Sequence, residues 1–575
     1  MKKSILAIAF LSASVIAEAK VVLPQFITDS MVVQQKSVLT IPGTTKAGTA
    51  VKVTTSWNNK TYQATADANG KFTVQVSTPK AGGPYKITFD DGDVTVLNDI
   101  LSGEVWMCSG QSNMEMPIMG WGHVMNCEQE RANAKYPNIR LLQIARVTSY
   151  KPEGDTKVNM GGWRRCAPET VDNFSALAYF YARELHKKLN VPIGVIDCSW
   201  GGTPAESWTS FAGVKEVGGF EKYTTMFEGN KFEAKAIEGI YNSAQENAQR
   251  NINAAVAEAN SNILAPISDK TMRVPQRWEG TVLPDFDGTV LCQKIFRVPD
   301  ELMGKDLELN LGLVDDNDIT YFNGVEVGRT EGYQQTRKYK IPASLVKKEN
   351  SILVVVTDTH GFGGIIGENS EVALKCGETS VFLSGNWNYK AVDNLANRPV
   401  NPTGPFVPTV LYNAMLHPCH VMPIKGVIWY QGCANVGRAD QYSVLFKRMI
   451  TDWRKLWGYD MPFYFVQLAG YLKPELLQPQ SDWAALRQAQ ADALALPKSG
   501  MATAIDIGNP TDIHPKNKQE VGRRLALLSL KNTYGKKNIV DKAPVVKKCT
   551  FADGQATIAF SNKVSVKNGD TPMGF

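Results

Sequence analysis

The alternation of apolar and polar positions first marks a β-rich stretch at residues 20–98. Short runs at 51–55 and 72–76 place apolar residues at every second position, and turns at Asn69-Gly70 and Gly82-Gly83-Pro84 separate such runs. A period of two is typical of strands with one buried face. We therefore predict a small N-terminal β-sandwich over this stretch.

After residue 99, longer segments with helical periodicity alternate with strands. Residues 174–189 place Leu177, Tyr181 and Leu185 on one helix face. Strands separated by helices indicate a parallel sheet that is covered on both faces. The predicted strands lie at 104–108, 191–196, 424–430, 463–468 and 501–506, and the predicted helices at 174–189, 441–456, 483–494 and 518–530.

A second β-rich stretch, residues 273–378, interrupts this α/β pattern. Runs at 307–311 and 352–356 flank the turn Asn323-Gly324, which predicts an inserted β-sandwich or jelly roll. The acidic run at 315–318 lacks the glycine and the distal glutamate of an EF-hand loop. We therefore expect a solvated turn there and no calcium site.

These transitions give the expected domain order. New β-like segments begin after Lys542 and the sequence stops at Met573-Gly574-Phe575, which suggests a truncated C-terminal β domain. The expected parts are a β-sandwich (20–98), the first part of an α/β domain (99–272), the inserted β domain (273–378), the second part of the α/β domain (379–537) and the start of a C-terminal β domain (538–575).

The first nineteen residues have the pattern of a signal peptide. Lys2 and Lys3 precede an apolar run at 5–16, and Ala17-Glu18-Ala19 forms an A-x-A cleavage signal. We expect residues 1–19 to direct export to a bacterial periplasm or to the medium. No later stretch approaches the ~20 apolar residues needed to cross a bilayer, so no membrane span is expected.

Composition and charge exclude two further classes of protein. Hydrophobic residues make up 43% and charged residues 21% of the 575 residues, so the chain can bury several cores and disorder is excluded as its main state. The net charge of +6 is spread without a basic block, which argues against nucleic acid as a partner.

The cysteines and histidines do not indicate a metal site. The nine cysteines include no CxxC pair, and their odd number leaves at least one unpaired. His417-Pro418-Cys419-His420 matches no standard zinc spacing, so a structural role is favoured there. Neither a metal nor another cofactor is expected.

Four segments that follow predicted strands contain the candidate chemistry. Carboxyl ends of parallel strands gather at one edge of the sheet, where ligands bind. Ser112 lies in the first segment and needs a base, because a free hydroxyl is a weak nucleophile at neutral pH. His514 is the natural base, and Asp512 could orient its ring. The segments are Gly110-Gln111-Ser112-Asn113-Met114, Trp200-Gly201-Gly202-Thr203, Gly432-Cys433-Ala434-Asn435 and Asp512-Ile513-His514-Pro515.

An acyl-transfer site also needs donors for the developing oxyanion. The Ser112 N–H, a glycine N–H from Gly201-Gly202 and the Asn435 side-chain amide are the candidates, with Gly202 as the preferred glycine. The segment around Ser112 lacks the second glycine of G-x-S-x-G, which argues against a nucleophile elbow of the α/β-hydrolase type.

The order Ser, Gly, Asn, His along four strand ends resembles the SGNH hydrolases. Within that group the chain is similar to the sialate O-acetylesterase family. The residues that carry the likeness are Leu23-Pro24, Met31-Val32-Val33-Gln34-Gln35, Gly82-Gly83-Pro84-Tyr85, Gly103-Glu104-Val105-Trp106, Gly110-Gln111-Ser112-Asn113-Met114-Glu115, Trp200-Gly201-Gly202-Thr203, Trp429-Tyr430-Gln431-Gly432, Asp512-Ile513-His514-Pro515 and Lys518-Gln519.

This resemblance implies an α/β fold, with a three-layer, flavodoxin-like SGNH hydrolase domain. It also implies a metal-independent serine esterase that removes O-acetyl groups from sialic acids, with Ser112 as nucleophile and His514 as base. Gln111 and Gln431 are candidates for substrate binding. An esterase of acetylated xylan or another acetylated glycan and a non-catalytic glycan-binding protein are the alternatives.

The sequence departs from the family pattern at two positions. Cys433 stands where many members carry an acidic residue. Asp512 precedes His514 by two residues, whereas SGNH enzymes usually have a spacing of three. Asp506, at the end of the preceding predicted strand, therefore remains an alternative for the acid.

Overall fold

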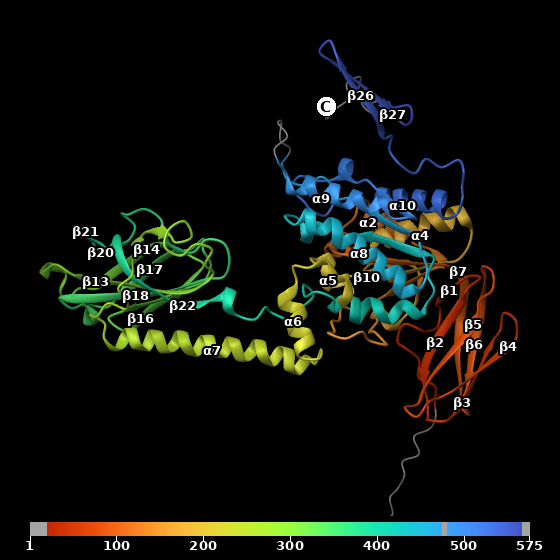
Figure 1. The fold of residues 1–575 in the computed structure, drawn as a ribbon, viewed down its shortest axis with the longest axis horizontal. Helices are drawn as coiled ribbons and strands as arrows, with labels where there is room; N and C mark the ends of the chain where they lie inside the picture. Colours follow the sequence, from red (N-terminus) through yellow and green to blue (C-terminus); the bar gives the residue numbers. More distant parts are fainter. Residues whose placement is uncertain (1–19, 474–479, 566–575) are drawn as a thin grey trace, which may run out of the picture. The chain divides into compact units, whose positions relative to one another are not determined.

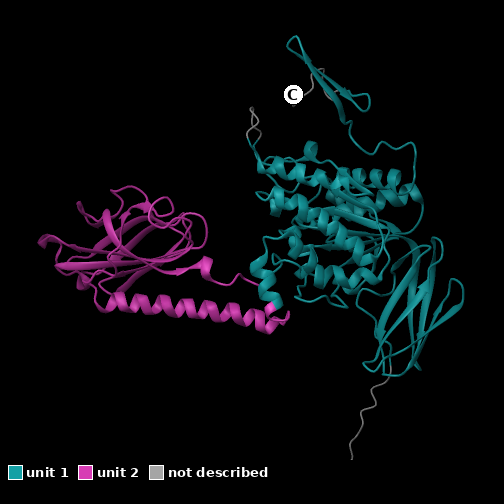
Figure 2. Cartoon of the chain, in the orientation of Figure 1, with its two compact units in different colours: residues 1–228, 403–575 teal, residues 229–402 magenta. Residues whose placement is uncertain are grey.

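The computed structural model describes residues 20–473 and 480–565 of the chain. It divides into two compact units, unit 1 with residues 1–228 and 403–575 and unit 2 with residues 229–402 (Figure 2). The predicted signal peptide lies outside the described residues. None of the described helices combines the length and the apolar character that crossing a membrane requires.

Unit 1 begins with a β-sandwich. β2 pairs with β5. β3 pairs with β4 and with β6, and β6 also pairs with the first part of β7. Phe72, Val74 and Val76 of β5 are buried and alternate with exposed neighbours, as expected for a strand with one buried face. The strands are β1 (Val32–Gln34), β2 (Val38–Thr44), β3 (Ala50–Thr55), β4 (Lys60–Thr65), β5 (Lys71–Ser77) and β6 (Gly82–Asp90).

A single long strand, β7 (Val94–Gly110), joins this sandwich to the α/β sheet. Its first part pairs with β6 as far as Ser102. Its second part, from Glu104 to Gly110, pairs in parallel with β10, and Trp106 to Gly110 pair with β23 on the other side. The border expected between residues 98 and 99 therefore falls inside a strand.

The α/β sheet has the strand order β25-β24-β23-β7-β10-β8-β9. All neighbours are parallel except β9, which is antiparallel to β8. Along the chain, β7 is followed by β8 and β10 on one side of it and then by β23, β24 and β25 on the other, and in open α/β sheets ligands bind where the strand order reverses in this way. Here that point lies between β7 and β23. The bounds are β8 (Tyr136–Gln143), β9 (Arg164–Cys166), β10 (Ile193–Ser199), β23 (Gly426–Tyr430), β24 (Phe463–Val466) and β25 (Ser499–Ala502).

Helices cover both faces of this sheet. The Trp106 ring meets Tyr181 of α4 at 5.3 Å between ring centroids, while Trp429 meets Trp453 of α8 at 5.6 Å. Because the register places these two tryptophans on opposite faces, α4 and α8 lie on opposite sides, and α10 packs beside α4 (Figure 1). The helices are α1 (Ser112–Glu115), α2 (Cys127–Ala132), α3 (Pro168–Val171), α4 (Ala176–Leu189), α5 (Phe211–Val217), α6 (Glu221–Gly229), α8 (Ala439–Trp457), α9 (Asp482–Ala491) and α10 (Lys518–Asn532).

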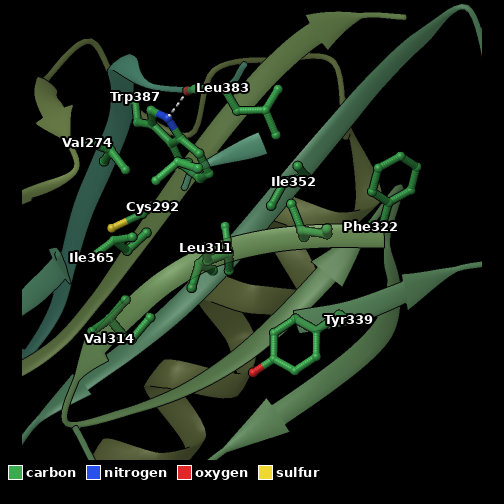
Figure 3. Close-up of a cluster of buried hydrophobic side chains, with 14 of the residues drawn as sticks. Val274, Cys292, Leu311, Val314, Phe322, Tyr339, Ile352, Ile365, Leu383 and Trp387 are labelled. Atoms are coloured by element: carbon green, nitrogen blue, oxygen red, sulfur yellow. Dashed lines mark hydrogen bonds between the residues drawn. The ribbon is translucent and has the colours of Figure 1, made fainter. Parts of the chain in front are cut away.

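Unit 2 consists of two β-sheets and the long helix α7 (Ala234–Ser261). Side chains such as Leu311, Ile352 and Trp387 form its buried core (Figure 3). Ile252 of α7 packs with Leu291 and other apolar residues of β13 and β18. Because α7 packs onto this sheet, unit 2 begins at residue 229, upstream of the insertion expected from residue 273. Its strands are β11 (Thr271–Val274), β12 (Gln276–Arg277), β13 (Gly288–Arg297), β14 (Leu307–Asp315), β15 (Asn317–Phe322), β16 (Val325–Thr330), β17 (Thr336–Ile341), β18 (Glu349–Asp358), β19 (Gly364–Ile366), β20 (Ala373–Cys376), β21 (Thr379–Phe382) and β22 (Gly385–Asn394).

The acidic run at 315–318 is not the solvated turn expected from the sequence. Asp318 is buried in β15, and its Oδ1 accepts a hydrogen bond from Arg337 Nε at 2.9 Å; both side chains are fully buried. The Tyr339 hydroxyl lies 2.9 Å from Asp318 Oδ2, and Arg337 also donates to the carbonyl oxygens of Gly332 and Asp316. The prediction was wrong because a partner nineteen residues away compensates the buried carboxylate.

The last described segment of the chain is a β-hairpin. β26 (Val546–Ala552) pairs antiparallel with β27 (Gln555–Phe560), and every residue of β26 is exposed. The hairpin lies within the expected C-terminal β domain, whose final ten residues are outside the described part of the chain.

Candidate active site

Ser112 follows the end of β7, at the point where the sheet order reverses. Gly110 makes this approach possible: it has a φ of +144°, and a Cβ there would lie 2.2 Å from the Tyr430 carbonyl oxygen at the end of β23. Ser112 then begins the short helix α1. Its Oγ lies 2.9 Å from His514 Nε2, so two groups that are 402 positions apart in the chain meet at hydrogen-bond distance.

The other ring nitrogen of His514 faces Asp512. His514 Nδ1 and Asp512 Oδ1 are 3.6 Å apart, and the same oxygen accepts a hydrogen bond from the His514 backbone N–H at 2.9 Å. A separation of 3.6 Å exceeds a hydrogen bond, although catalytic contacts are often longer before substrate binds. Asp506 points elsewhere: its carboxylate binds Arg524 Nη1 and Nη2, each at 2.6 Å. The structure thus brings Asp512, and not Asp506, to the histidine.

A buried lysine connects the serine and histidine loops. Lys518, the first residue of α10, is fully buried, and its Nζ donates to Asn113 Oδ1 at 2.8 Å and to the Pro515 carbonyl oxygen at 2.6 Å. Burial lowers the pKa of Lys518 to about 7, while Asp512 and Cys433 act in the opposite direction. The ammonium therefore tethers the residue after the nucleophile to the residue after the base.

Burial also lowers the pKa of His514, and the nearby charge of Lys518 lowers it further, while Asp512 raises it. A lowered pKa keeps the imidazole neutral at neutral pH, which is the form that can accept a proton from Ser112. The sequence pattern identified Lys518 only as part of the family motif. Its position four residues after His514 in the sequence was the only sign that it lies near the base.

The Gly201-Gly202 segment lies against Ser112. A Cβ on Gly201 would lie 3.4 Å from Ser112 Cβ and 2.8 Å from Glu115 Oε2, and the Gly201 N–H donates to that same oxygen at 2.8 Å. Gly202 has a φ of +78° and lies beside the exposed ring of Phe406. Because the Gly201 N–H is already bound, Gly202 is the glycine whose N–H remains a candidate donor.

The Asn435 side chain is buried and held on three sides. Its Oδ1 accepts from the Ala205 N–H at 3.0 Å and from Gln431 Nε2 at 2.7 Å, and its Nδ2 donates one hydrogen to Glu206 Oε2 at 2.9 Å. Arg438 in turn binds the other oxygen of Glu206 at 2.8 Å. The amide is therefore fixed in orientation. Its Nδ2 carries two hydrogens, and the bond to Glu206 uses one of them.

The two glutamines expected at the substrate instead connect loops. Gln111 is buried, and its Oε1 accepts from the Gly432 N–H at 3.0 Å. Gln431 is fully buried and donates to Thr203 O as well as to Asn435. The structure places both in hydrogen bonds within the protein, which fix the ends of β7 and β23.

The histidine–cysteine motif at residues 417–420 contacts backbone. His417 Nδ1 is 2.9 Å from the Glu153 carbonyl oxygen, and His420 Nδ1 is 2.5 Å from that of His417. No group of three or more metal-ligating side chains occurs within the part of the chain that the structure describes. All nine cysteines are free thiols, and burial raises the pKa of Cys433 to about 12, so this thiol is protonated at neutral pH.

The sequence analysis assigned no role to two carboxylates near the site, although Glu115 belongs to a motif that carries the family resemblance. Glu115 binds the Gly201 N–H, and Glu206 fixes Asn435. Their roles depend on loops that come from distant parts of the chain, and a local pattern does not show them.

Comparisons with known proteins agree with the motifs. Residues 401–531 match the family model of carbohydrate esterases described as sialic acid-specific acetylesterases, and residues 24–96 match a bacterial Ig domain. The sialate O-acetylesterase of Mus musculus is 24% identical, over 95% of this chain and 80% of its own length. That of Rattus norvegicus is also 24% identical, over 91% of this chain and 75% of its own length.

A solved structure shares the fold. The crystal structure of a carbohydrate acetylesterase from Xanthomonas citri superimposes with a TM-score of 0.58, covering 94% of this chain and 82% of its own at 24% identity. The family model and the two curated relatives confirm the resemblance of this chain to the sialate O-acetylesterase family, and the solved structure supports the fold.

Proposed function

We propose that this protein is an exported serine esterase that removes O-acetyl groups from sialic acids through an acetyl-serine intermediate. The observation that carries the proposal is the 2.9 Å contact between Ser112 Oγ and His514 Nε2. The lowered pKa of His514 supports it, because it favours the neutral imidazole. The sialate preference rests on the family resemblance, and the export rests on the pattern of residues 1–19.

In the first step, Ser112 Oγ attacks the carbonyl carbon of the acetyl ester while His514 Nε2 takes the hydroxyl proton. Asp512 orients the ring and stabilises the imidazolium that forms. The tetrahedral intermediate then collapses: the bond between the carbonyl carbon and the sugar oxygen breaks, and His514 returns the proton to that oxygen. The sugar leaves with a free hydroxyl, and the acetyl group stays on Ser112.

In the second step, water replaces the sugar. His514 takes a proton from the water, whose oxygen attacks the acetyl carbonyl carbon. When this intermediate collapses, the bond to Ser112 Oγ breaks and the proton goes to the serine, so acetic acid leaves and the enzyme is restored. Nucleophile and base both come from the chain, so no step requires a metal.

The oxyanion formed in each step needs hydrogen-bond donors. The backbone N–H groups of Ser112 and Gly202 and the second Nδ2 hydrogen of Asn435 fill this role in the proposal. Loss of one such donor typically costs about 10²–10³ in turnover. The fixed orientation of Asn435 beside Glu206 suits a donor that must not reorganise during the reaction.

The test uses wild type and Ser112→Ala with a chromogenic acetate ester and with O-acetylated sialic acid. We expect wild type to release acetate from both and to form an acetylated Ser112 that intact-protein mass spectrometry detects after rapid quenching. Ser112→Ala should lose nearly all turnover while keeping its circular dichroism spectrum. Wild-type turnover in this variant would refute the nucleophile assignment, and hydrolysis of acetylated xylan in preference to the sialic acid would favour the alternative substrate.

A further inference from the structure

A pocket of about 500 Å³ opens beside the loop that carries Ser112, and Glu115 and Pro117 line it. This volume is within the roughly 300–1,000 Å³ range of small-molecule sites. Trp121 lines it, and the Trp121 ring meets the His514 ring edge-on at 5.2 Å between centroids while remaining 55% exposed. One residue of the pocket wall therefore contacts the ring of His514.

The charges that line this pocket cancel. Arg146 Nε donates to Glu115 Oε1 at 2.7 Å, and Arg146 Nη2 binds the same oxygen. Glu115 Oε2 is bound to the Gly201 N–H. A guanidinium that is already paired with a carboxylate attracts a second anion only weakly, because the net charge of the pair is zero.

Behind the pocket wall, Asp197 carries less than a full negative charge at neutral pH. It is buried, and its oxygens accept hydrogen bonds from Ser199 Oγ and Gln143 Nε2. Burial raises the pKa of Asp197 to about 7, with a further contribution from Glu115. The pocket is thus polar with little net charge.

The remaining polar side chains of the pocket suit hydroxyl groups. Among the described residues, the Asn173 side-chain amide has no hydrogen-bond partner. Asn159 Nδ2 binds Gln143 Oε1 at 3.0 Å, which leaves its Oδ1 as an acceptor. An amide both donates and accepts, as a sugar hydroxyl does, and the Trp121 ring offers an apolar surface for the C–H face of a sugar ring.

We propose that this pocket binds the uncharged, hydroxyl-bearing part of the acetylated sugar, with the ring against Trp121 and hydroxyl groups on Asn173 and Asn159. The inference rests on the proposed function, because it places the sugar next to the ester that Ser112 attacks. It deepens that function: binding of the sugar in this pocket does not depend on a sugar carboxylate.

The first experiment compares wild type with Trp121→Ala, Asn173→Ala and the control Phe551→Ala, which removes an exposed ring from the C-terminal hairpin. Each protein is assayed on a mono-O-acetylated methyl galactoside and on p-nitrophenyl acetate, which has no sugar. The quantity measured is the ratio of the two kcat/KM values.

We expect this ratio to fall about five- to tenfold in the two pocket variants, as for loss of one net hydrogen bond or an equivalent apolar contact. In Phe551→Ala it should equal wild type. An unchanged ratio in both pocket variants overturns the proposal.

The second experiment tests whether the carboxylate is needed. Wild type is assayed on O-acetylated sialic acid and on the same sugar with its carboxylate converted to an amide. We expect KM values within about threefold of each other, since the charges of the pocket cancel. A KM more than tenfold higher for the amide overturns the claim that the pocket takes an uncharged part of the sugar.

A binding measurement separates the two proposals. The Ser112→Ala protein is titrated with unacetylated methyl galactoside by NMR, and the Ser112→Ala/Asn173→Ala protein is titrated in the same way. Weaker binding to the double variant supports the pocket whether or not the protein is an esterase, and equal binding overturns it. Hydrolysis of p-nitrophenyl acetate that survives Ser112→Ala counts against the proposed function instead.

Discussion

Arg337 in unit 2 and Lys518 in unit 1 are both fully buried cations, but their partners differ. Arg337 faces the Asp318 carboxylate and several carbonyl oxygens. Within the described part of the chain, Lys518 Nζ hydrogen-bonds to neutral oxygens, those of Asn113 and Pro515. Removing the arginine from its pair would leave a buried carboxylate unpaired, whereas burial without a bound carboxylate lowers the pKa of Lys518 to about 7. The uncompensated charge lies at the catalytic loops, as perturbed groups often do.

The largest effect is expected from Asp512, the carboxylate that faces His514 and also raises the pKa of Lys518. Asp512→Asn keeps the shape of the side chain but removes the charge that stabilises the imidazolium, so kcat should fall, approaching the roughly 10⁴-fold loss of other triad acids. Asp506→Asn should stay near wild type, because its carboxylate is half exposed and pairs with Arg524 rather than with His514. Steady-state kinetics on p-nitrophenyl acetate measures both.

The reverse result, a crippled Asp506→Asn and an active Asp512→Asn, would show that the acid is misassigned. If both variants stay active, Ser112 and His514 work as a dyad.

The next prediction tests Arg337, the buried cation that is paired with a carboxylate. Arg337→Met leaves the Asp318 carboxylate buried without its ion pair, which should cost about 3–5 kcal/mol of stability. Denaturant unfolding followed by tryptophan fluorescence measures the loss, and Trp387 in the core of unit 2 is one reporter. Arg337→Met/Asp318→Leu should recover much of it, because no unpaired charge remains.

Comparable unfolding midpoints for Arg337→Met and wild type would show that the pair contributes little. In that case the buried pair of Arg337 and Asp318 would not account for the difference between the two buried cations.

A smaller effect is expected on the pH dependence of catalysis. The Lys518 charge lowers the pKa of His514, so Lys518→Met should raise that pKa and move the acidic limb of the kcat/KM profile to higher pH. Lys516→Met is the matched control, because it removes an exposed lysine two positions away. If the acidic limb stays in place while kcat alone falls, Lys518 acts only as a tether.

The last prediction concerns how the free energy of unfolding depends on pH. The pKa of Lys518 is about 7 in the folded protein, below its ordinary value of 10.5, so between these values the unfolded chain binds more protons. Stability therefore gains a positive slope with pH from about 7 to 10.5, and Lys518 opposes folding most below pH 7. Lys518→Met should flatten this slope in urea unfolding curves measured across that range. An unchanged slope would place the lysine pKa near its ordinary value.

Much of unit 1 could be predicted from local patterns. The helices expected at 174–189 and 518–530 correspond to α4 (Ala176–Leu189) and α10 (Lys518–Asn532), because their apolar stripes face a single buried surface. Ser112 and His514 could be singled out because each follows a predicted strand of a parallel sheet, and the ends of such strands converge.

Features that depend on distant partners escaped the sequence analysis. The burial of Asp318 needs Arg337, and the tether from Lys518 needs Asn113, which is 405 positions away in the chain. The resemblance made Gln431 a candidate for substrate binding, but its side chain is buried and donates to Asn435. In each case a local pattern shows the residue type and not the group that it meets.

The course of β7 has a consequence for synthesis and folding. β7 ends at Gly110, but β23, its parallel neighbour on one side, begins only at Gly426. Until the ribosome has made the intervening chain, including residues 229–402, that side of β7 is an unpaired apolar edge, which is where strands add to other chains. Contacts between such distant segments form slowly, because a long loop must close first. That edge of β7 therefore stays unpaired throughout the interval in which unit 2 is made.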